Sequence, residues 1–165
     1  MSLKKFTALL LAIAHQAAGQ LVDESWKGQG TVLVIEGSDY PWGPDDPLSS
    51  KVGCLNADGK LIADNGNCAV LDANVTHLLS ETGECGWAVR AGEGAQPSVL
   101  TCSTPTPTYY GFYRLNNQRE PIYLSYGSGY LGWSADARPT GDQIVDLYQG
   151  QGWADIDLVL LWSPV

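Results

Sequence analysis

Short apolar runs rich in β-branched and aromatic residues, separated by turns that contain glycine, recur along most of this chain. Many short strands at regular spacing are typical of an all-β fold. The strands that we expect lie at residues 31–35, 51–57, 60–63, 67–71, 86–90, 98–102, 109–115, 122–126, 130–134 and 156–162. The pattern predicts an all-β fold, either an antiparallel sandwich or a small barrel.

The last of these runs is apolar on both faces. The even-numbered residues from 156 to 162 are all apolar and share one face of a strand, and Val159 and Leu161 make the other face apolar as well. Strands that are buried on both sides have this near-continuous apolar character. We therefore expect residues 156–162 to form a central strand.

Other segments depart from the strand pattern. Residues 38–50 contain three prolines, which indicates an irregular loop. Residues 103–108 form a second break, which is too short for a stalk between domains and is expected to join two halves of one domain. The helix candidates are short, at 74–81 and 141–149, so one or two short helices are expected beside the strands.

The N-terminal residues have the order of a secretory signal. Lys4 and Lys5 supply a positive start, residues 6–14 are apolar and uncharged, and Ala17 and Gly19 are the small residues at positions −3 and −1 of a cut before residue 20. The apolar run is shorter than the about 20 residues that a membrane span needs. We expect residues 1–19 to be removed and residues 20–165 to form a single secreted domain.

The charge balance limits the classes of partner. Removing the signal leaves seven basic and eighteen acidic residues, a formal charge of −11. Nucleic-acid affinity depends on cations that neutralise phosphates, so nucleic acids and anionic membranes are poor partners for this chain. A strong negative charge also keeps a protein soluble and monomeric, and we expect a monomer.

All four cysteines lie beyond the signal, at positions 54, 68, 85 and 102. An even number of cysteines in an oxidising compartment predicts two disulfides. A zinc site is the alternative, but the cysteines are widely spaced without a C-x-x-C pair, and His77 is the single histidine beyond the signal. We therefore expect no metal and no cofactor.

Two turn signals bear on the pairing of the first two cysteines. If Asp58-Gly59 and Asn65-Gly66 both closed two-residue hairpins, Cys54 and Cys68 would each lie opposite Ala63. They would then be two strands apart, roughly 9.5 Å, which exceeds the roughly 7 Å limit for a disulfide. A Cys54–Cys68 bond therefore requires one of these turns to be a wider loop.

The other two cysteines meet no such objection. Cys85 and Cys102 border the same expected hairpin, in which a bond between facing strands is easily made. We favour the set Cys54–Cys68 and Cys85–Cys102, with crossed pairings as the alternative.

Asn74-Val75-Thr76 is an acceptor sequence for N-glycosylation, which matters because the chain is expected to enter the secretory pathway. The neighbouring His77 would have to serve any Ser-His-Asp arrangement, and no G-x-S-x-G motif accompanies it. A trio of His77, Glu81 and Arg90 can be assembled, but any chain of this size offers such a trio. We interpret His77 as a surface residue, and the catalytic residues, if there are any, stay unknown.

Paired carboxylates are the basis of an enzyme hypothesis. Asp155 and Asp157 would share one face of a strand, and Asp142 and Asp146 would share one face of the predicted helix. Glycoside hydrolysis needs two carboxyl groups about 5 to 10 Å apart. Solvated surface charge is the better interpretation of both pairs, because a chain with 18 acids offers many such combinations.

Aromatic residues concentrate between positions 109 and 133. Exposed rings beside glycines can form a flat surface that stacks on sugars or anchors a protein partner. The alternative is that these rings fill the core of the β fold, where aromatic residues are common. The rings predicted to form a binding surface are Tyr110, Tyr113, Tyr126, Tyr130 and Trp133.

Four short segments carry a family resemblance: Lys-Val-Gly-Cys-Leu-Asn-Ala-Asp-Gly-Lys at 51–60, Asn-Cys-Ala-Val at 67–70, Gly-Glu-Cys-Gly-Trp at 83–87 and Thr-Cys at 101–102. In these the chain resembles small secreted cysteine-containing proteins of filamentous fungi, the group from which effector candidates of plant-associated species are drawn. The resemblance implies an extracellular role in virulence at a host or wall surface. It brings no catalytic residues with it.

The leading hypothesis is an effector-like, non-catalytic secreted protein that binds a host protein or a cell-wall glycan through an aromatic β surface. The second hypothesis is a small extracellular hydrolase or cyclising enzyme that uses paired carboxylates. A structural wall or coat protein is a third possibility.

Overall fold

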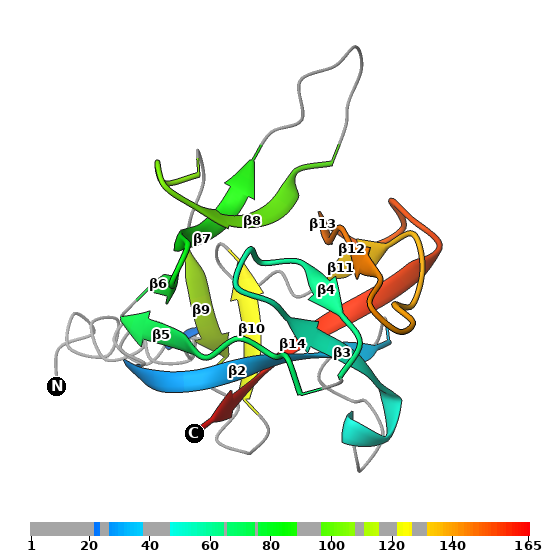
Figure 1. Cartoon of the computed structure of the whole chain (residues 1–165), viewed down its shortest axis with the longest axis horizontal. Coiled ribbons are helices and arrows are strands. Elements are labelled where there is room, and N and C mark those ends of the chain that lie inside the picture. Colours follow the sequence, from blue (N-terminus) through cyan, green and yellow to red (C-terminus); the bar gives the residue numbers. More distant parts are fainter. Residues whose placement is uncertain are drawn as a thin grey trace, which may run out of the picture.

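The computed structural model describes the chain in nine stretches, residues 22–23, 27–37, 47–64, 66–74, 76–88, 97–107, 111–115, 122–126 and 132–165. Within these stretches the structure consists of antiparallel strands and one short 3-10 turn, η1 (Pro47–Ser50) (Figure 1). A search of the same stretches finds no helix with the length and apolar character of a membrane span. The all-β prediction is confirmed, and the fold is a barrel.

Eight strands close the barrel, each pairing antiparallel with the next. In order around the barrel they are β2 (Lys27–Glu36), β5 (Leu71–Asn74), β6 (His77–Ser80), β7 (Gly83–Ala88), β8 (Val99–Ser103), β13 (Tyr148–Gln149), β11 (Trp133–Ala135) and β14 (Ile156–Pro164). The closing pair is β2 with β14, whose register runs from Glu36 opposite Leu158 to Gly30 opposite Pro164. These two long strands lie side by side across the molecule (Figure 1).

Two groups of shorter strands extend this barrel. From β2 the sheet continues to β3 (Lys51–Leu55), β4 (Leu61–Ile62) and β12 (Ile144–Val145). From β14 it continues to β10 (Ile122–Tyr126), β9 (Phe112–Leu115) and β1 (Val22–Asp23). The first group is relevant to the site described below, because η1 leads directly into β3.

Strand β14 is buried on both faces, as predicted. Leu158, Leu160 and Trp162 belong to the main core inside the barrel. Val159 and Leu161 belong to a second apolar cluster on the other face, which includes Tyr123 of β10. Burial raises the pKa of the Tyr123 phenol above its ordinary value of 10.0, because the charged form loses solvation there.

Both helix predictions are wrong. Asn74, the last residue of β5, pairs with His77, the first residue of β6, which runs to Ser80. Residues 141–149 contain two short strands, and β12 among them pairs with β4 through Ile144 opposite Ile62. In both segments, pairing with a neighbouring strand outweighs the weak local helical tendency.

The predicted disulfides are confirmed as Cys54–Cys68 and Cys85–Cys102. Cys85 and Cys102 lie directly opposite each other on β7 and β8. Neither expected two-residue hairpin forms before Cys68: Cys54 pairs with Ile62 across a wider loop, and the residues after Gly66 reach β5, which pairs with β2. Ala69 donates its N–H to the Leu55 carbonyl at the end of β3, 2.9 Å away, so the segment that carries Cys68 lies beside the strand that carries Cys54.

The tip of the β3–β4 hairpin is the loop of residues 56–60, which packs against the barrel. The Asn56 side-chain oxygen accepts hydrogen bonds from the backbone N–H of Asp58 and Lys60, which fixes the loop. The Asp58 carbonyl then accepts a hydrogen bond of 2.9 Å from the N–H of Cys102 on β8. The loop therefore ties the β3–β4 extension to the strand that carries the second disulfide.

Gly59 occupies this loop with a φ of +75°, and a Cβ there would lie 2.9 Å from the Cys102 sulfur. We expect Gly59→Ala to lower the free energy of unfolding by about 1–3 kcal/mol, since it combines a left-handed backbone with an overpacked contact. Urea unfolding followed by circular dichroism measures the change. The matched control is Gly66→Ala, where φ is +86° and nothing lies within 4 Å of the added Cβ. Equal losses for the two variants would contradict the packing argument.

Candidate functional site

The predicted aromatic surface is wrong for Trp133. Its side chain is fully buried and belongs to the barrel core, because β11 is a barrel strand whose inner face carries this residue. Tyr126 is half-buried and packs against the same core. The backbone of Tyr113 lies in β9, whereas its side chain, Tyr110 and Tyr130 lie outside the described part of the molecule.

Four of the described rings form an interior cluster. Trp87 of β7 contacts Phe112, Tyr126 and Trp133 edge-to-face, with ring centroids 4.8, 5.3 and 4.9 Å apart. Aromatic pairs at these distances prefer such geometry because the ring edge is positive and the ring face negative. These side chains fill the barrel, so for them the core interpretation holds.

The four carboxylates proposed for catalysis are either exposed or accept hydrogen bonds that hold loops. Asp142 lies exposed in a turn, and Asp146 accepts a 2.8 Å hydrogen bond from the Lys60 ammonium. Asp155 is exposed, and Asp157 accepts a 2.8 Å hydrogen bond from the Gly152 N–H. The helix that would have placed residues 142 and 146 on one face is absent from this described segment. Asp146 and Asp157 therefore hold loops in place.

His77 contacts a carboxylate that no sequence motif singles out. Its Nδ1 pairs with Glu84 of the neighbouring strand β7. Glu81 is exposed in the turn between the two strands, and Arg90 lies outside the described residues. His77 and Glu84 thus link adjacent strands of the barrel.

One group of potential metal ligands is occupied by a covalent bond. The sulfur atoms of Cys54 and Cys68 and the carboxylate of Asp64 lie within 4.8 Å of one another. The two sulfurs are joined as a disulfide, and a thiolate is what binds zinc. With this bond intact the group is not a metal site.

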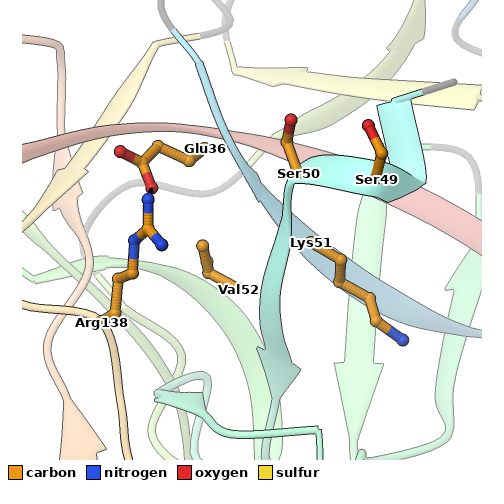
Figure 2. A pocket seen from close by; sticks show the side chains of 6 residues that line it. All are labelled: Glu36, Ser49, Ser50, Lys51, Val52 and Arg138. Carbon is orange, nitrogen blue, oxygen red and sulfur yellow. Dashed lines mark ion pairs between the residues drawn. The ribbon is translucent and has the colours of Figure 1, made fainter.

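A pocket of about 410 Å³ opens between the end of β2, the η1–β3 segment and the loop that follows β11 (Figure 2). Pockets that bind small ligands have volumes of about 300–1,000 Å³. Apart from the apolar side chain of Val52, the pocket is lined by polar side chains. The lining residues are Glu36, Ser49, Ser50, Lys51, Val52 and Arg138.

Charged groups at this pocket are arranged in two ion pairs. The Arg138 guanidinium contacts the Glu36 carboxylate, and this pair stands on one side of Val52 (Figure 2). Lys51 points its ammonium away from that pair, toward Asp64, with which it forms the second ion pair (Figure 2). Besides Lys51, the polar side chains that line the pocket are therefore those of the Glu36–Arg138 pair and of Ser49 and Ser50.

Long-range pairing of strands brings the two sides of this pocket together. Glu36 at the end of β2 lies opposite Leu158 of β14, and Trp133 of β11 also pairs with Leu158 from the other side. Arg138 follows β11 by three residues, which places it near Glu36. The pocket thus depends on the same pairings that close the barrel.

A second, smaller pocket of about 230 Å³ lies over β4 and β12. It is lined by Asn56, Ile62, Asn67, Gly141, Asp142 and Ile144. The side-chain oxygen of Asn56 is already committed to two backbone N–H groups of the hairpin loop. The larger pocket is therefore the better candidate for a binding site.

Comparison of the chain with protein-family models, curated proteins and solved structures found no match.

Proposed function

We propose that this chain is a secreted, effector-like protein that acts by binding, and that its ligand is a cell-wall glycan held in the pocket between η1 and Arg138. The observation that carries the proposal is the pocket itself, which is lined by hydroxyl, carboxylate and guanidinium groups together with the apolar side chain of Val52. Sugars present hydroxyls around their edge and C–H groups on their faces. The polar side chains of the lining can form hydrogen bonds with the hydroxyls, and Val52 can contact the C–H groups.

The acidic residues support binding over catalysis. Three carboxylates accept hydrogen bonds from neighbouring groups. Asp146 accepts one from the Lys60 ammonium, and Asp136 accepts one of 2.7 Å from the Tyr148 hydroxyl. Asp157 accepts one from the backbone N–H of Gly152. These contacts fix loops onto a barrel that two disulfides already stabilise. A rigid scaffold of this kind limits the entropy that is lost when a ligand binds.

A glycan is favoured over a host protein by the shape of the site. Protein partners usually dock on surfaces with about 800 Å² buried on each side and with aromatic anchors at their centre. The aromatic cluster built around Trp87 packs inside the barrel instead. The concave pocket with mostly polar walls suits one or a few sugar units.

Secretion is part of the proposal, and two observations support it. Two disulfides fit an oxidising compartment. Asn74 is exposed at the end of β5, where a glycan would project into solvent. We propose that the protein is exported with removal of residues 1–19 and carries a glycan on Asn74.

A sedimentation assay tests the proposed binding. Protein purified from the medium of a secreting host is mixed with insoluble chitin, cellulose or β-1,3-glucan, and the protein left in solution is measured. We expect depletion by at least one polymer, and Arg138→Ala should weaken the affinity by at least about tenfold, because a hydrogen bond to a charged group contributes about 1.5–3 kcal/mol.

Lys27→Ala is the control for this assay. Lys27 is an exposed cation on β2 that does not line the pocket, so this variant should bind as the unmodified protein does. Failure to bind any of the three polymers, or equal binding by the Arg138→Ala protein, would refute the proposal.

A further inference from the structure

We infer, building on the proposed glycan function, that the pocket selects neutral sugars over acidic ones, and that Asp64 sets this selectivity by holding Lys51 out of the pocket. Two cations, Lys51 and Arg138, belong to the pocket lining in a protein that is otherwise strongly acidic. Both cations are paired with carboxylates, Arg138 with Glu36 and Lys51 with Asp64.

The first pair neutralises the guanidinium inside the site. Glu36 is the more buried partner, with 33% of its side chain exposed against 64% for Arg138. An acidic ligand that approached Arg138 would meet the Glu36 carboxylate at the same place, and like charges at short range repel. A neutral hydroxyl can donate to this carboxylate or accept from the guanidinium without that repulsion.

The second ion pair, between Lys51 and Asp64, holds the remaining cation away from the pocket. The Lys51 side chain extends away from the Glu36–Arg138 pair, and its ammonium contacts Asp64 (Figure 2). Asp64 lies in the segment between β4 and Cys68, and its Oδ1 is 3.4 Å from the Cys68 sulfur. Because Cys68 is bonded to Cys54 of β3, the carboxylate is kept close to the strand that carries Lys51.

The selectivity follows from this balance of charges. Each cation of the lining is matched by one carboxylate, so the pocket offers hydrogen-bonding groups without a net charge that would attract a uronate. Releasing Lys51 from Asp64 would make a mobile ammonium available at the pocket edge. The chain would then gain affinity for acidic sugars.

The test compares a neutral and an acidic oligosaccharide by calorimetric titration of the secreted protein. The neutral probe is an oligomer of whichever polymer the protein sediments with, and the acidic probe is an oligogalacturonate. The unmodified protein should prefer the neutral probe. In Asp64→Asn the affinity for oligogalacturonate should rise roughly fivefold, the effect of a partly exposed ion pair of about 1 kcal/mol.

Two further variants separate a local effect from a change in overall charge. Asp72→Asn removes the same charge from an exposed position on β5 that does not line the pocket, and it should leave both affinities unchanged. Adding Lys51→Met to Asp64→Asn should cancel the gain, because the gain depends on the released ammonium.

The outcomes distinguish this inference from the proposed function. If the protein binds no neutral oligosaccharide, the proposed glycan function and this inference are both refuted. If it binds the neutral probe but Asp64→Asn gains no more affinity for oligogalacturonate than Asp72→Asn does, the glycan function stands and this inference is overturned. A gain that persists with Lys51→Met would overturn it as well.

Discussion

Replacing Trp87 by alanine is expected to lower the free energy of unfolding by about 3–5 kcal/mol, the range for large aromatic residues removed from a core. Trp87 is 5% exposed, and its ring touches Phe112, Tyr126 and Trp133. Because these rings come from the barrel strands β7 and β11 and from β9 and β10 of the extension, the loss would loosen contacts between the barrel and that extension. Guanidinium unfolding followed by circular dichroism measures the loss.

Trp153 provides the matched control. It lies in the loop between β13 and β14 and is 52% exposed. Trp153→Ala should cost less than about 1 kcal/mol, as surface substitutions usually do. The interior role assigned to Trp87 would be wrong if both alanine variants unfolded at the same guanidinium concentration.

Removal of the Cys85–Cys102 bond should have the second largest effect. Its half-cystines are 17 residues apart, and the entropy model gives about 3 kcal/mol for a loop of that size. Both residues are buried in the main core, so alanine is the suitable replacement at each position. We expect the double variant Cys85→Ala with Cys102→Ala to have a free energy of unfolding lower by that amount. Urea unfolding followed by circular dichroism measures the difference.

The other disulfide makes an informative comparison. Cys54 and Cys68 are 14 residues apart, so the entropic part of their contribution should be nearly the same. Cys68 is only half-buried, however, so removing its sulfur should cost less packing energy than removing a sulfur of the Cys85–Cys102 bond. A larger loss from the Cys54–Cys68 pair than from Cys85–Cys102 would contradict the assignment of the second bond to the main core.

The sequence predicts those features of the fold that depend on local residue patterns or on the geometric limits of a disulfide. The β class follows from short alternating runs, and β14 is recognisable because apolar residues occupy both of its faces. The distance argument about Cys54 and Cys68 required that the two turns not both close tight hairpins, and the segment that carries Cys68 indeed lies beside the end of β3 instead of pairing with β4. Such features depend on neighbours that are close in sequence.

The two helix predictions covered only the short segments 74–81 and 141–149, in which too few residues are present for a helical period to be recognised. Asp142 and Asp146 are four residues apart, but the strand pair between β12 and β4 decides the structure there. At the start of the other segment, and just before it, a period of two was present: Leu71 and Ala73 are buried, and Asp72 and Asn74 are exposed. That alternation is the signal that could have identified β5.

The candidate pocket could not be predicted from the sequence. Glu36 and Arg138 are about a hundred positions apart, and they meet only because β14 pairs with β2 on one side and with β11 on the other. Trp133 illustrates the same limit: alternation shows that adjacent residues face opposite ways, but closure of the barrel determines which face is inside.

The most direct test of glycan binding in the pocket is an amide chemical-shift titration of the isotope-labelled secreted protein with the neutral oligosaccharide. Binding there predicts that the largest shifts fall at Glu36, at Ser49 to Val52 and at Arg138, on the three segments that line the pocket. Shifts confined to β10 and β11 would instead place the ligand on the aromatic strands and contradict the assignment of the pocket as the binding site.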